Sequence, residues 1–206
     1  MDRLTITEQA DNGTVARWLE SQLDAVLAAT HDPVSICIPG GSTPFPILEE
    51  LTASQIDWRR IHVWPGDDRI VPEDHPASNV GKIKALLEPA GATIVALCED
   101  IKPPHFSIVW LGMGADGHIA SLFPGNDPQA DDTHKVRRLT PDPLPPEAPF
   151  DRLTLTIPAL LDSDQIIFVI RGEEKRAIFG DAAAGRNDLP VARLLNAAEQ
   201  PVQCFT

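Results

Sequence analysis

A glycine-rich loop that begins at Gly112 carries the residues of this sequence best suited to acid/base chemistry. It follows the apolar run 106–111 and holds one carboxylate, Asp116, two residues before one imidazole, His118. Glycines let the backbone approach a ligand closely, and an imidazole titrates near neutral pH. The alternative is a structural histidine that only completes a hydrogen bond. Because active sites commonly lie on loops at the carboxyl ends of strands, the spacing predicts that Asp116 and His118 form a catalytic unit.

A second glycine-containing segment could bind an anion. Gly40, Gly41, Ser42 and Thr43 lie between a predicted strand and a predicted helix. Backbone N–H groups at a helix N-terminus attract negative charge, and the two hydroxyls add hydrogen-bond donors. The same residues also suit a tight turn with a Ser or Thr cap, so the segment alone leaves both interpretations open. No lysine follows the glycines, which separates this segment from the GxxxxGK[ST] loop of nucleotide hydrolases.

Four more polar residues lie near the ends of predicted strands and could contact an anion or a sugar. They are Asp67, Arg69, Arg152 and Lys175. Arg69 could hold a phosphate through two parallel hydrogen bonds, and Asp67 could orient it or accept hydrogen bonds from sugar hydroxyls. Each of these residues could instead be a solvated surface charge. The loops that follow successive parallel strands gather at one edge of a sheet, and this convergence favours a binding site.

Overall charge and composition narrow the classes of function. The chain has 206 residues, a formal net charge of −13 and 43% apolar residues. A strongly acidic chain lacks the basic surface that displaces phosphate counterions, so we expect no nucleic acid and no membrane as partner. A small anion stays compatible, because a few local cations override distant charge. Three widely spaced cysteines, no metal-binding pattern and an N-terminus without an apolar leader indicate a soluble cytoplasmic protein without a metal.

The elements that must position these groups alternate between strand and helix. Apolar spacing predicts helices over 13–29, 42–51, 76–87, 158–161 and 172–184, with a short helix after His118 that Pro124 ends. Apolar runs predict strands over 33–38, 60–64, 93–97, 106–111, 152–156 and 165–170, and one near Val136 within a proline- and acid-rich loop, 127–150. The alternation predicts an α/β fold in a single domain, 1–206, with an open, mostly parallel sheet and helices on both faces.

Together these motifs resemble the 6-phosphogluconolactonase branch of the glucosamine-6-phosphate isomerase/6-phosphogluconolactonase family. They occur in the family's order over most of the chain. The segments that carry the resemblance are Gly40–Pro44, Asp67–Arg69, Val71–Pro72, Ser78–Asn79, Leu111–Gly125, Arg152–Thr156 and Gly172–Lys175. The string Gly-Met-Gly-Ala-Asp-Gly-His-Ile-Ala-Ser-Leu-Phe-Pro is highly specific, whereas the shorter segments are weak when taken separately.

The resemblance implies a Rossmann-like α/β domain that hydrolyses 6-phosphoglucono-δ-lactone to 6-phosphogluconate in the pentose phosphate pathway, without metal or organic cofactor. It makes His118 the general base, with Asp116 beside it, and makes Arg69 and Lys175 ligands of the phosphate. The full set of implied substrate-binding residues is Gly40, Gly41, Ser42, Thr43, Asp67, Arg69, Arg152 and Lys175. The expected partner is a small phosphorylated sugar lactone, and the expected state is a monomer or weak homo-oligomer.

Three departures from the family pattern concern the surroundings of these motifs. Asp68 stands where the family usually has a glutamate, which shortens an orienting side chain by one methylene. The segment between Leu97 and Phe106 is too short for the helix that relatives usually carry there. The chain also ends at Thr206, before the usual final segment. We therefore expect a trimmed periphery around intact catalytic loops.

Two other functions share some of these motifs. Glucosamine-6-phosphate deaminases contain the Gly-Gly-Ser-Thr-Pro and Asp-Gly-His elements, but here the second element continues in the lactonase version, and Arg69 stands where deaminases carry an aromatic residue. A non-catalytic sugar-phosphate sensor is the second alternative. Such sensors are normally fused to a DNA-binding module, and this sequence shows neither a helix-turn-helix extension nor a basic patch. Turnover of a phosphorylated lactone separates the lactonase from both.

Overall fold

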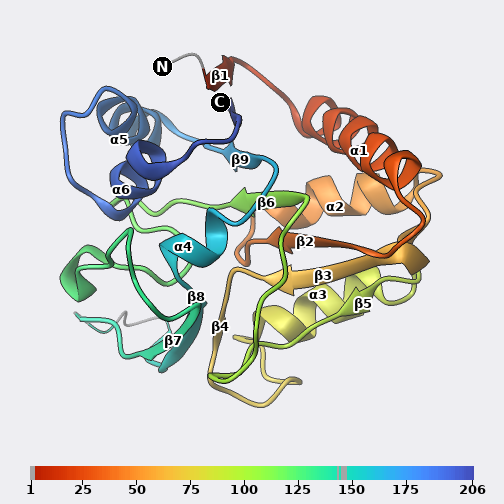
Figure 1. The fold of residues 1–206 in the computed structure, drawn as a ribbon, viewed down its shortest axis with the longest axis horizontal. Helices are drawn as coiled ribbons and strands as arrows, with labels where there is room; N and C mark the ends of the chain where they lie inside the picture. The colour runs from red at the N-terminus through yellow and green to blue at the C-terminus, as the bar shows by residue number, and fades with distance from the viewer. Residues whose placement is uncertain (1–2, 143, 145–147) are drawn as a thin grey trace.

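A seven-stranded sheet forms the centre of the protein (Figure 1). The computed structural model describes residues 3–142, 144 and 148–206. From one edge to the other, the strands are β1 Leu4–Thr7, β10 Val202–Phe205, β9 Ile166–Val169, β6 Ile108–Leu111, β2 Val34–Ile38, β3 Ile61–Pro65 and β5 Thr93–Ile94. All neighbouring strands of this sheet run parallel. The predicted α/β fold with a mostly parallel sheet is confirmed.

Helices cover both faces of the sheet, as expected for strands that are apolar on both sides. One face packs against α1 Asn12–Ala29, α2 Pro44–Thr52 and α3 Asn79–Leu87, and the other against α4 Ile157–Leu160, α5 Glu173–Ala183 and α6 Pro190–Ala197. Figure 1 shows α1 and α2 on one side, and α5 and α6 on the other, of the strands β6 and β9. Two 3₁₀ turns are η1 Trp58–Arg60 and η2 Pro124–Asn126.

Successive residues of each central strand supply the two apolar cores in turn. In β2, Ile36 and Ile38 belong to the core under α1 and α2, whereas Cys37 between them belongs to the core under α5 and α6. In β9, Ile167 belongs to the core under α1 and α2, and Phe168 belongs to the core under α5 and α6. Side chains alternate across a strand, and each fully buried Leu or Ile contributes about 1.5–3 kcal/mol. Burial on both faces therefore holds both helical layers to the sheet.

The topological switch of the sheet lies at β2, which has β3 on one side and β6 on the other. From β2 the chain moves outward to β3 and β5, then returns to β6 and continues in the opposite direction to β9. Loops that leave neighbouring strands in opposite directions open a crevice at the carboxyl ends of those strands. The candidate residues lie on the loops after β2, β3, β6 and β9, so the topology brings them to this crevice.

A small antiparallel sheet fixes the path of the chain beyond β3. Its strands, in spatial order, are β4 Asp67–Arg69, β8 Arg152–Leu155 and β7 Val136–Leu139. The Gly66 N–H donates to the Ile38 carbonyl at 3.0 Å, and the Leu155 N–H donates to the Gly66 carbonyl at 2.9 Å. These bonds join the two sheets and determine the direction in which β4 leaves the end of β3.

The prediction of a short helix after His118 is wrong. Ile119 instead forms an isolated bridge to Met113, so the chain folds back on itself, and Pro124 opens η2 instead of ending a helix. The cause is backbone conformation: Gly117 has a φ of 77° and Ala120 a φ of 49°. Both angles lie outside the helical region.

Other differences concern where elements begin and end. Helix α3 begins at Asn79, not at Pro76, because the Ser78 hydroxyl accepts the Gly81 N–H at 3.0 Å and caps the helix there. The strand expected over 93–97 is confined to Thr93–Ile94. The strand expected near Val136 is confirmed as β7. No element was predicted for the segments that form β1, α6 and β10.

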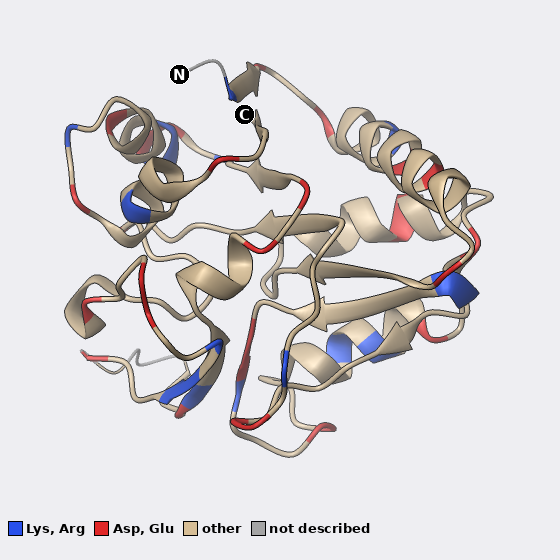
Figure 2. Cartoon of the chain, viewed as in Figure 1, with Lys and Arg blue, Asp and Glu red and all other residues tan. Residues whose placement is uncertain are grey.

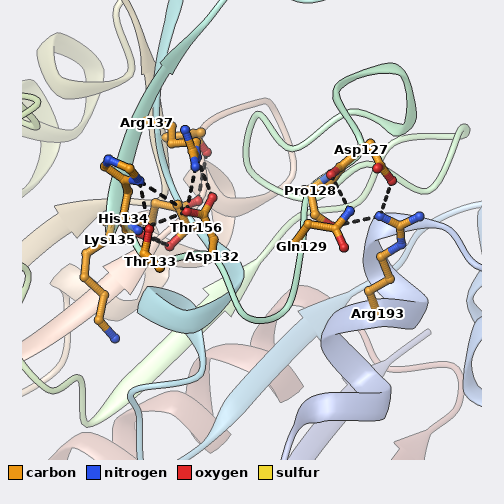
Figure 3. Close-up of polar contacts among 12 residues, drawn as sticks. Asp127, Pro128, Gln129, Asp132, Thr133, His134, Lys135, Arg137, Thr156 and Arg193 are labelled. Atoms are coloured by element: carbon orange, nitrogen blue, oxygen red, sulfur yellow. Dashed lines mark hydrogen bonds and ion pairs between the residues drawn. The ribbon is translucent and has the colours of Figure 1, made fainter.

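Charged side chains tie the proline- and acid-rich segment to its neighbours (Figure 3). Arg193 on α6 contacts Asp127 Oδ1 at 2.6 Å and donates to the Pro128 carbonyl at 3.0 Å. Farther along, Arg137 Nη2 of β7 contacts Asp132 Oδ1 at 2.8 Å. Residues 143 and 145–147 of the predicted loop lie outside the described residues. The contacts attach the first part of the loop to α6 and to the small sheet.

Acidic residues are distributed along the chain instead of gathered in one place. Figure 2 shows Asp and Glu positions on α1, α2 and α5 and on several connecting loops. Among the described residues, no helix is both long enough and apolar enough to cross a membrane. Since the acidic charge is dispersed, any anion site must be built from cations gathered locally.

One exposed contact gives the fold a predicted pH dependence. His105 precedes β6, and its two ring nitrogens lie 2.9 Å from Asp162 Oδ1 and 2.9 Å from Asp164 Oδ1, in the turn before β9. Only the protonated ring can donate from both nitrogens. Hydrogen bonds to Asp162 and Asp164 raise the pKa of His105 above its ordinary value. Protonated His105 therefore stabilises the folded state.

We expect replacement of His105 by Asn to lower the free energy of unfolding more at pH 6 than at pH 8.5. A raised pKa in the folded state gives stability that is present below the unfolded pKa and is lost as pH rises through the folded pKa. The side chain is 55% exposed, so the difference should be about 0.5 kcal/mol or less. Denaturant unfolding at the two pH values measures it, with His31→Asn as an exposed control. An equal loss at both pH values would contradict the prediction.

Candidate active site

A cavity of about 350 Å³ opens at the carboxyl ends of β2, β3, β6 and β9. This volume suits a small metabolite. The predicted site residues that line it are Gly40, Gly41, Ser42, Thr43, Asp67, Arg69, His118 and Lys175. Asp116 contacts His118 directly, whereas Arg152 is not part of the wall. The structure therefore brings together groups from four separate loops, as the convergence of strand ends predicts.

Asp116 and His118 form a hydrogen-bonded pair at the mouth of the cavity. Asp116 Oδ1 lies 2.6 Å from His118 Nδ1 and also accepts the His118 backbone N–H at 3.2 Å. The His118 ring lies against Phe123, with 4.6 Å between the ring centroids. The imidazole side chain is 31% exposed. One nitrogen is thus engaged by a carboxylate, and Nε2 has no protein partner among the described residues, which is the arrangement of an oriented base.

Two glycines make this pair sterically possible. A Cβ at Gly114 would lie 2.2 Å from His118 ring atoms and 2.6 Å from Asp116 Oδ1. A Cβ at Gly117 would lie 2.7 Å from the side chain of Leu189, just before α6. The Gly114 N–H donates to the His118 carbonyl at 2.9 Å and closes the turn. The loop is therefore compact because these positions lack side chains.

The loop between β2 and α2 presents backbone to the cavity. Gly41 has a φ of 96°, and a Cβ at Gly40 would lie 2.1 Å from the Asn79 amide oxygen. At the start of α2, Thr43 makes no side-chain capping bond among the described residues. The first N–H groups of a helix lack intrahelical acceptors. The loop and the N-terminus of α2 therefore offer the cavity a set of N–H and hydroxyl donors suited to an anion.

Asp68 joins β4 to the beginning of α3. Its carboxylate accepts three backbone N–H groups, from Arg69 at 2.8 Å, Asn79 at 2.6 Å and Val80 at 3.1 Å. Burial nonetheless raises the pKa of Asp68. The shorter side chain at this position thus makes a complete set of contacts, and these hold Asn79 next to Arg69.

Arg69 is positioned through one end of its guanidinium. Its Nη1 donates to Asn79 Oδ1 at 2.7 Å and to the Ala77 carbonyl at 3.1 Å. Asn79 in turn donates to the Asp67 carbonyl at 2.8 Å. Sequence reasoning did not assign Asn79 a role in the site, although the Ser-Asn pair is part of the resembling pattern. Its function here is to fix the orientation of Arg69 in the cavity wall.

Arg152 lies behind the cavity wall. It is 3% exposed, pairs with Arg69 across β4 and β8, and donates to the Ala148 carbonyl at 3.0 Å. Burial and the nearby charge of Arg69 lower the pKa of Arg152. Arg152 is therefore not among the predicted binding residues that line the cavity, and the antiparallel register pairs it with Arg69 in the neighbouring strand of the small sheet.

Lys175 and Arg171 form the fourth side of the cavity. Lys175 is on the first turn of α5, and Arg171 immediately precedes that helix. Arg171 was not predicted as a site residue, because a single arginine before a helix has the appearance of a solvated charge. Together with Arg69 they place three cations in the wall, against one lining carboxylate, Asp67. The cavity is therefore locally basic in an acidic chain.

None of the three cysteines lines the cavity. Burial raises the pKa of the Cys204 thiol to about 12 and the pKa of Cys37 well above its ordinary range. A thiol with a raised pKa is a poor nucleophile at neutral pH. Among the described residues, no three His, Cys, Asp or Glu side chains cluster in a way that could hold a metal ion. The chemistry that the geometry offers is proton transfer by His118.

Known proteins are similar to this chain in sequence and in fold. Residues 7–203 match the family described as Glucosamine-6-phosphate isomerases/6-phosphogluconolactonase. A 6-phosphogluconolactonase of Neisseria meningitidis serogroup A is 31% identical, over 92% of this chain and 93% of the relative. One of Mesorhizobium japonicum is 34% identical, over 82% and 80%. A crystal structure of 6-phosphogluconolactonase from Thermotoga maritima has the same fold, with a TM-score of 0.83 at 24% identity and coverage of 98% of each chain. The chain belongs to the glucosamine-6-phosphate isomerase/6-phosphogluconolactonase family.

Proposed function

We propose that the protein hydrolyses 6-phosphoglucono-δ-lactone to 6-phosphogluconate, a step of the pentose phosphate pathway. The observation that carries the proposal is a single cavity lined by two chemically different sets of groups. One set is the Asp116–His118 pair, and the other is Lys175 with the donors of the loop 40–43. A phosphorylated lactone needs both, because its phosphate is an anion and its carbonyl must meet an activated water. The names of the curated relatives agree with this substrate.

In the proposed mechanism His118 is the general base. The Nδ1–H group donates a hydrogen bond to Asp116 Oδ1, 2.6 Å away, so the lone pair of the neutral ring is on Nε2. As water attacks C1 of the lactone, a new C–O bond forms and Nε2 takes a proton from the water. The bond between C1 and the ring oxygen then breaks, and the proton passes from His118 to that oxygen. Asp116 stabilises the imidazolium between the two steps.

The phosphate is the proposed anchor that places C1 beside His118. The loop 40–43 supplies N–H and hydroxyl donors, Lys175 supplies a charge, and Arg69 offers the terminal nitrogen that Asn79 and Ala77 do not use. Binding energy from a group remote from the reacting carbon can orient that carbon for attack. Asp67 is the proposed acceptor for a sugar hydroxyl. Arg152 supports Arg69 from behind.

Hydrolysis of freshly made 6-phosphoglucono-δ-lactone tests the proposed function. The rate is measured as acid release, against the spontaneous background and beside unphosphorylated glucono-δ-lactone at the same concentration. We expect acceleration of the phosphorylated substrate and little of the other. Binding of 6-phosphogluconate by the folded protein without any acceleration would refute the lactonase and favour a sugar-phosphate sensor.

Replacement of His118 by Asn should lower kcat by a factor of about 10²–10⁴, the usual contribution of a positioned general base. Affinity for 6-phosphogluconate should change little, because His118 is not among the proposed phosphate ligands. Calorimetric titration with the product shows that the variant is folded and binds. If the folded variant kept the turnover of the wild type, His118 would have no part in the chemistry.

Replacement of Gly114 by Ala should reduce kcat/KM at least tenfold while the protein stays folded. The new methyl group would overlap the His118 ring and Asp116, and a displacement of about 1 Å can cost about 100-fold in rate. Gly180→Ala on α5 is the matched control, because nothing lies within 4 Å of a Cβ there. That control should keep full activity and gain up to about 1 kcal/mol of stability. Equal activity of the two variants would contradict the assigned geometry.

A further inference from the structure

Arg171 differs from Arg69 and Arg152 in that its side chain has no hydrogen-bond partner among the described residues. It lies two residues beyond the end of β9, lines the cavity, and is followed by Gly172 with a φ of 92° at the start of α5. Both terminal nitrogens, Nη1 and Nη2, are inaccessible to solvent and make no hydrogen bond to any described residue. Buried guanidinium groups are normally paired, so this one requires an explanation.

No carboxylate of the described residues lies within ion-pair distance, 4.0 Å, of Arg171. The acidic group that acts on it most strongly is Asp11, but no Asp11 oxygen lies within 4.0 Å of it, and Asp11 Oδ1 already accepts the Thr14 N–H at 2.7 Å as the cap of α1. Its other charged or titratable neighbours are the buried thiol of Cys204 and a second cation, Arg176. Removal from water lowers the pKa of Arg171. A charge is thus held at the cavity without a counterion from the described residues.

Arg193 shows how the same chain satisfies an arginine that has a structural role. Its guanidinium contacts Asp127 at 2.6 Å, Asp188 at 2.8 Å and the Pro128 carbonyl at 3.0 Å (Figure 3 draws the first and last of these). Arg171 has none of these contacts, although the chain carries an excess of acidic residues. The missing partner of Arg171 is therefore best sought in a ligand that enters the cavity.

We propose that Arg171 binds the substrate's phosphate directly. In the ligand-free protein its terminal nitrogens are covered, so the flexible side chain must turn into the cavity as the ligand enters, and Nη1 and Nη2 then donate hydrogen bonds to two phosphate oxygens. The two donors of a guanidinium match the oxygens of a phosphate monoester. Lys175, on the first turn of α5, lines the same cavity and can contact the same anion. The inference rests on the proposed function for the identity of the ligand, a sugar phosphate, and makes Arg171 a residue that selects phosphorylated over neutral lactones.

The test compares Arg171→Met and Arg171→Lys with Arg176→Gln, an exposed arginine on the same helix that does not line the cavity. The probes are 6-phosphogluconate and inorganic phosphate, and the readouts are the dissociation constant and the Tm with and without ligand. We expect Arg171→Met to bind 6-phosphogluconate at least about tenfold more weakly. Its ligand-free Tm should equal or exceed that of the wild type, because an unpaired buried charge has been removed.

Arg171→Lys keeps the charge but loses the paired donors, so its affinity should lie between those of Arg171→Met and the wild type. Arg176→Gln should bind as the wild type does. In the lactone assay, Arg171→Met should lose most of the preference for the phosphorylated substrate, mainly through a higher KM. The inference would be overturned if a folded Arg171→Met or Arg171→Lys variant bound 6-phosphogluconate with wild-type affinity. It would also be overturned if Arg171→Met had a lowered ligand-free Tm and the ligand raised that Tm as much as it raises the Tm of the wild type.

These results separate the inference from the proposed function. A wild-type protein that accelerates lactone hydrolysis, with affinity and KM unchanged in both Arg171 variants, would leave the lactonase standing and overturn the role of Arg171. If the wild-type protein bound 6-phosphogluconate through Arg171 without hydrolysing the lactone, the role of Arg171 would stand and the lactonase function would be refuted.

Discussion

The carboxylate of Asp68 is the interaction on which the geometry of the site depends most. By accepting three backbone N–H groups, two of them at the start of α3, it joins the small sheet to that helix. Asn79 is thereby held between the Asp67 carbonyl and Arg69. The same Asn79 leaves no room for a side chain at Gly40. One half-buried acid therefore helps to set the positions of a cation in the wall and of the backbone loop beside it.

The second organising feature is a basic cavity in a chain of net charge −13. Exposed acidic groups are screened over about 8–10 Å at physiological ionic strength, so their effect inside the cavity is weak. The cavity wall instead contains Arg69, Arg171 and Lys175 with Asp67 as its lining carboxylate. The same cavity contains His118, whose Nδ1 lies 2.6 Å from Asp116 Oδ1. Cations and a carboxylate-supported imidazole thus line one cavity, and the proposed substrate, a phosphorylated lactone, would use both.

Much of the fold was predictable because its signals are local. Apolar runs such as 165–170 and the helical spacing over 13–29 identify buried elements without knowledge of their partners. Edge strand β1, Leu4–Thr7, has only four residues, in which apolar and polar side chains alternate, so it lacks the long apolar run that identifies a buried strand in the sequence. The sequence predicts a helix after His118, but the chain turns there, because its path depends on the positive φ of Gly117 and on the side chain of Leu189, which is distant in the sequence. The convergence of site residues followed from topology, whereas the unpaired state of Arg171 is visible only in three dimensions.

The position of bound 6-phosphogluconate in a crystal structure of the complex would test the account's central claim most directly. The claim is that the phosphate and the reacting carbon occupy opposite ends of one cavity. The account predicts the phosphate between the loop 40–43 and Lys175, with the C1 carboxylate next to His118 Nε2. A product bound in the reverse direction, with its phosphate against His118, or bound outside this cavity, would contradict it.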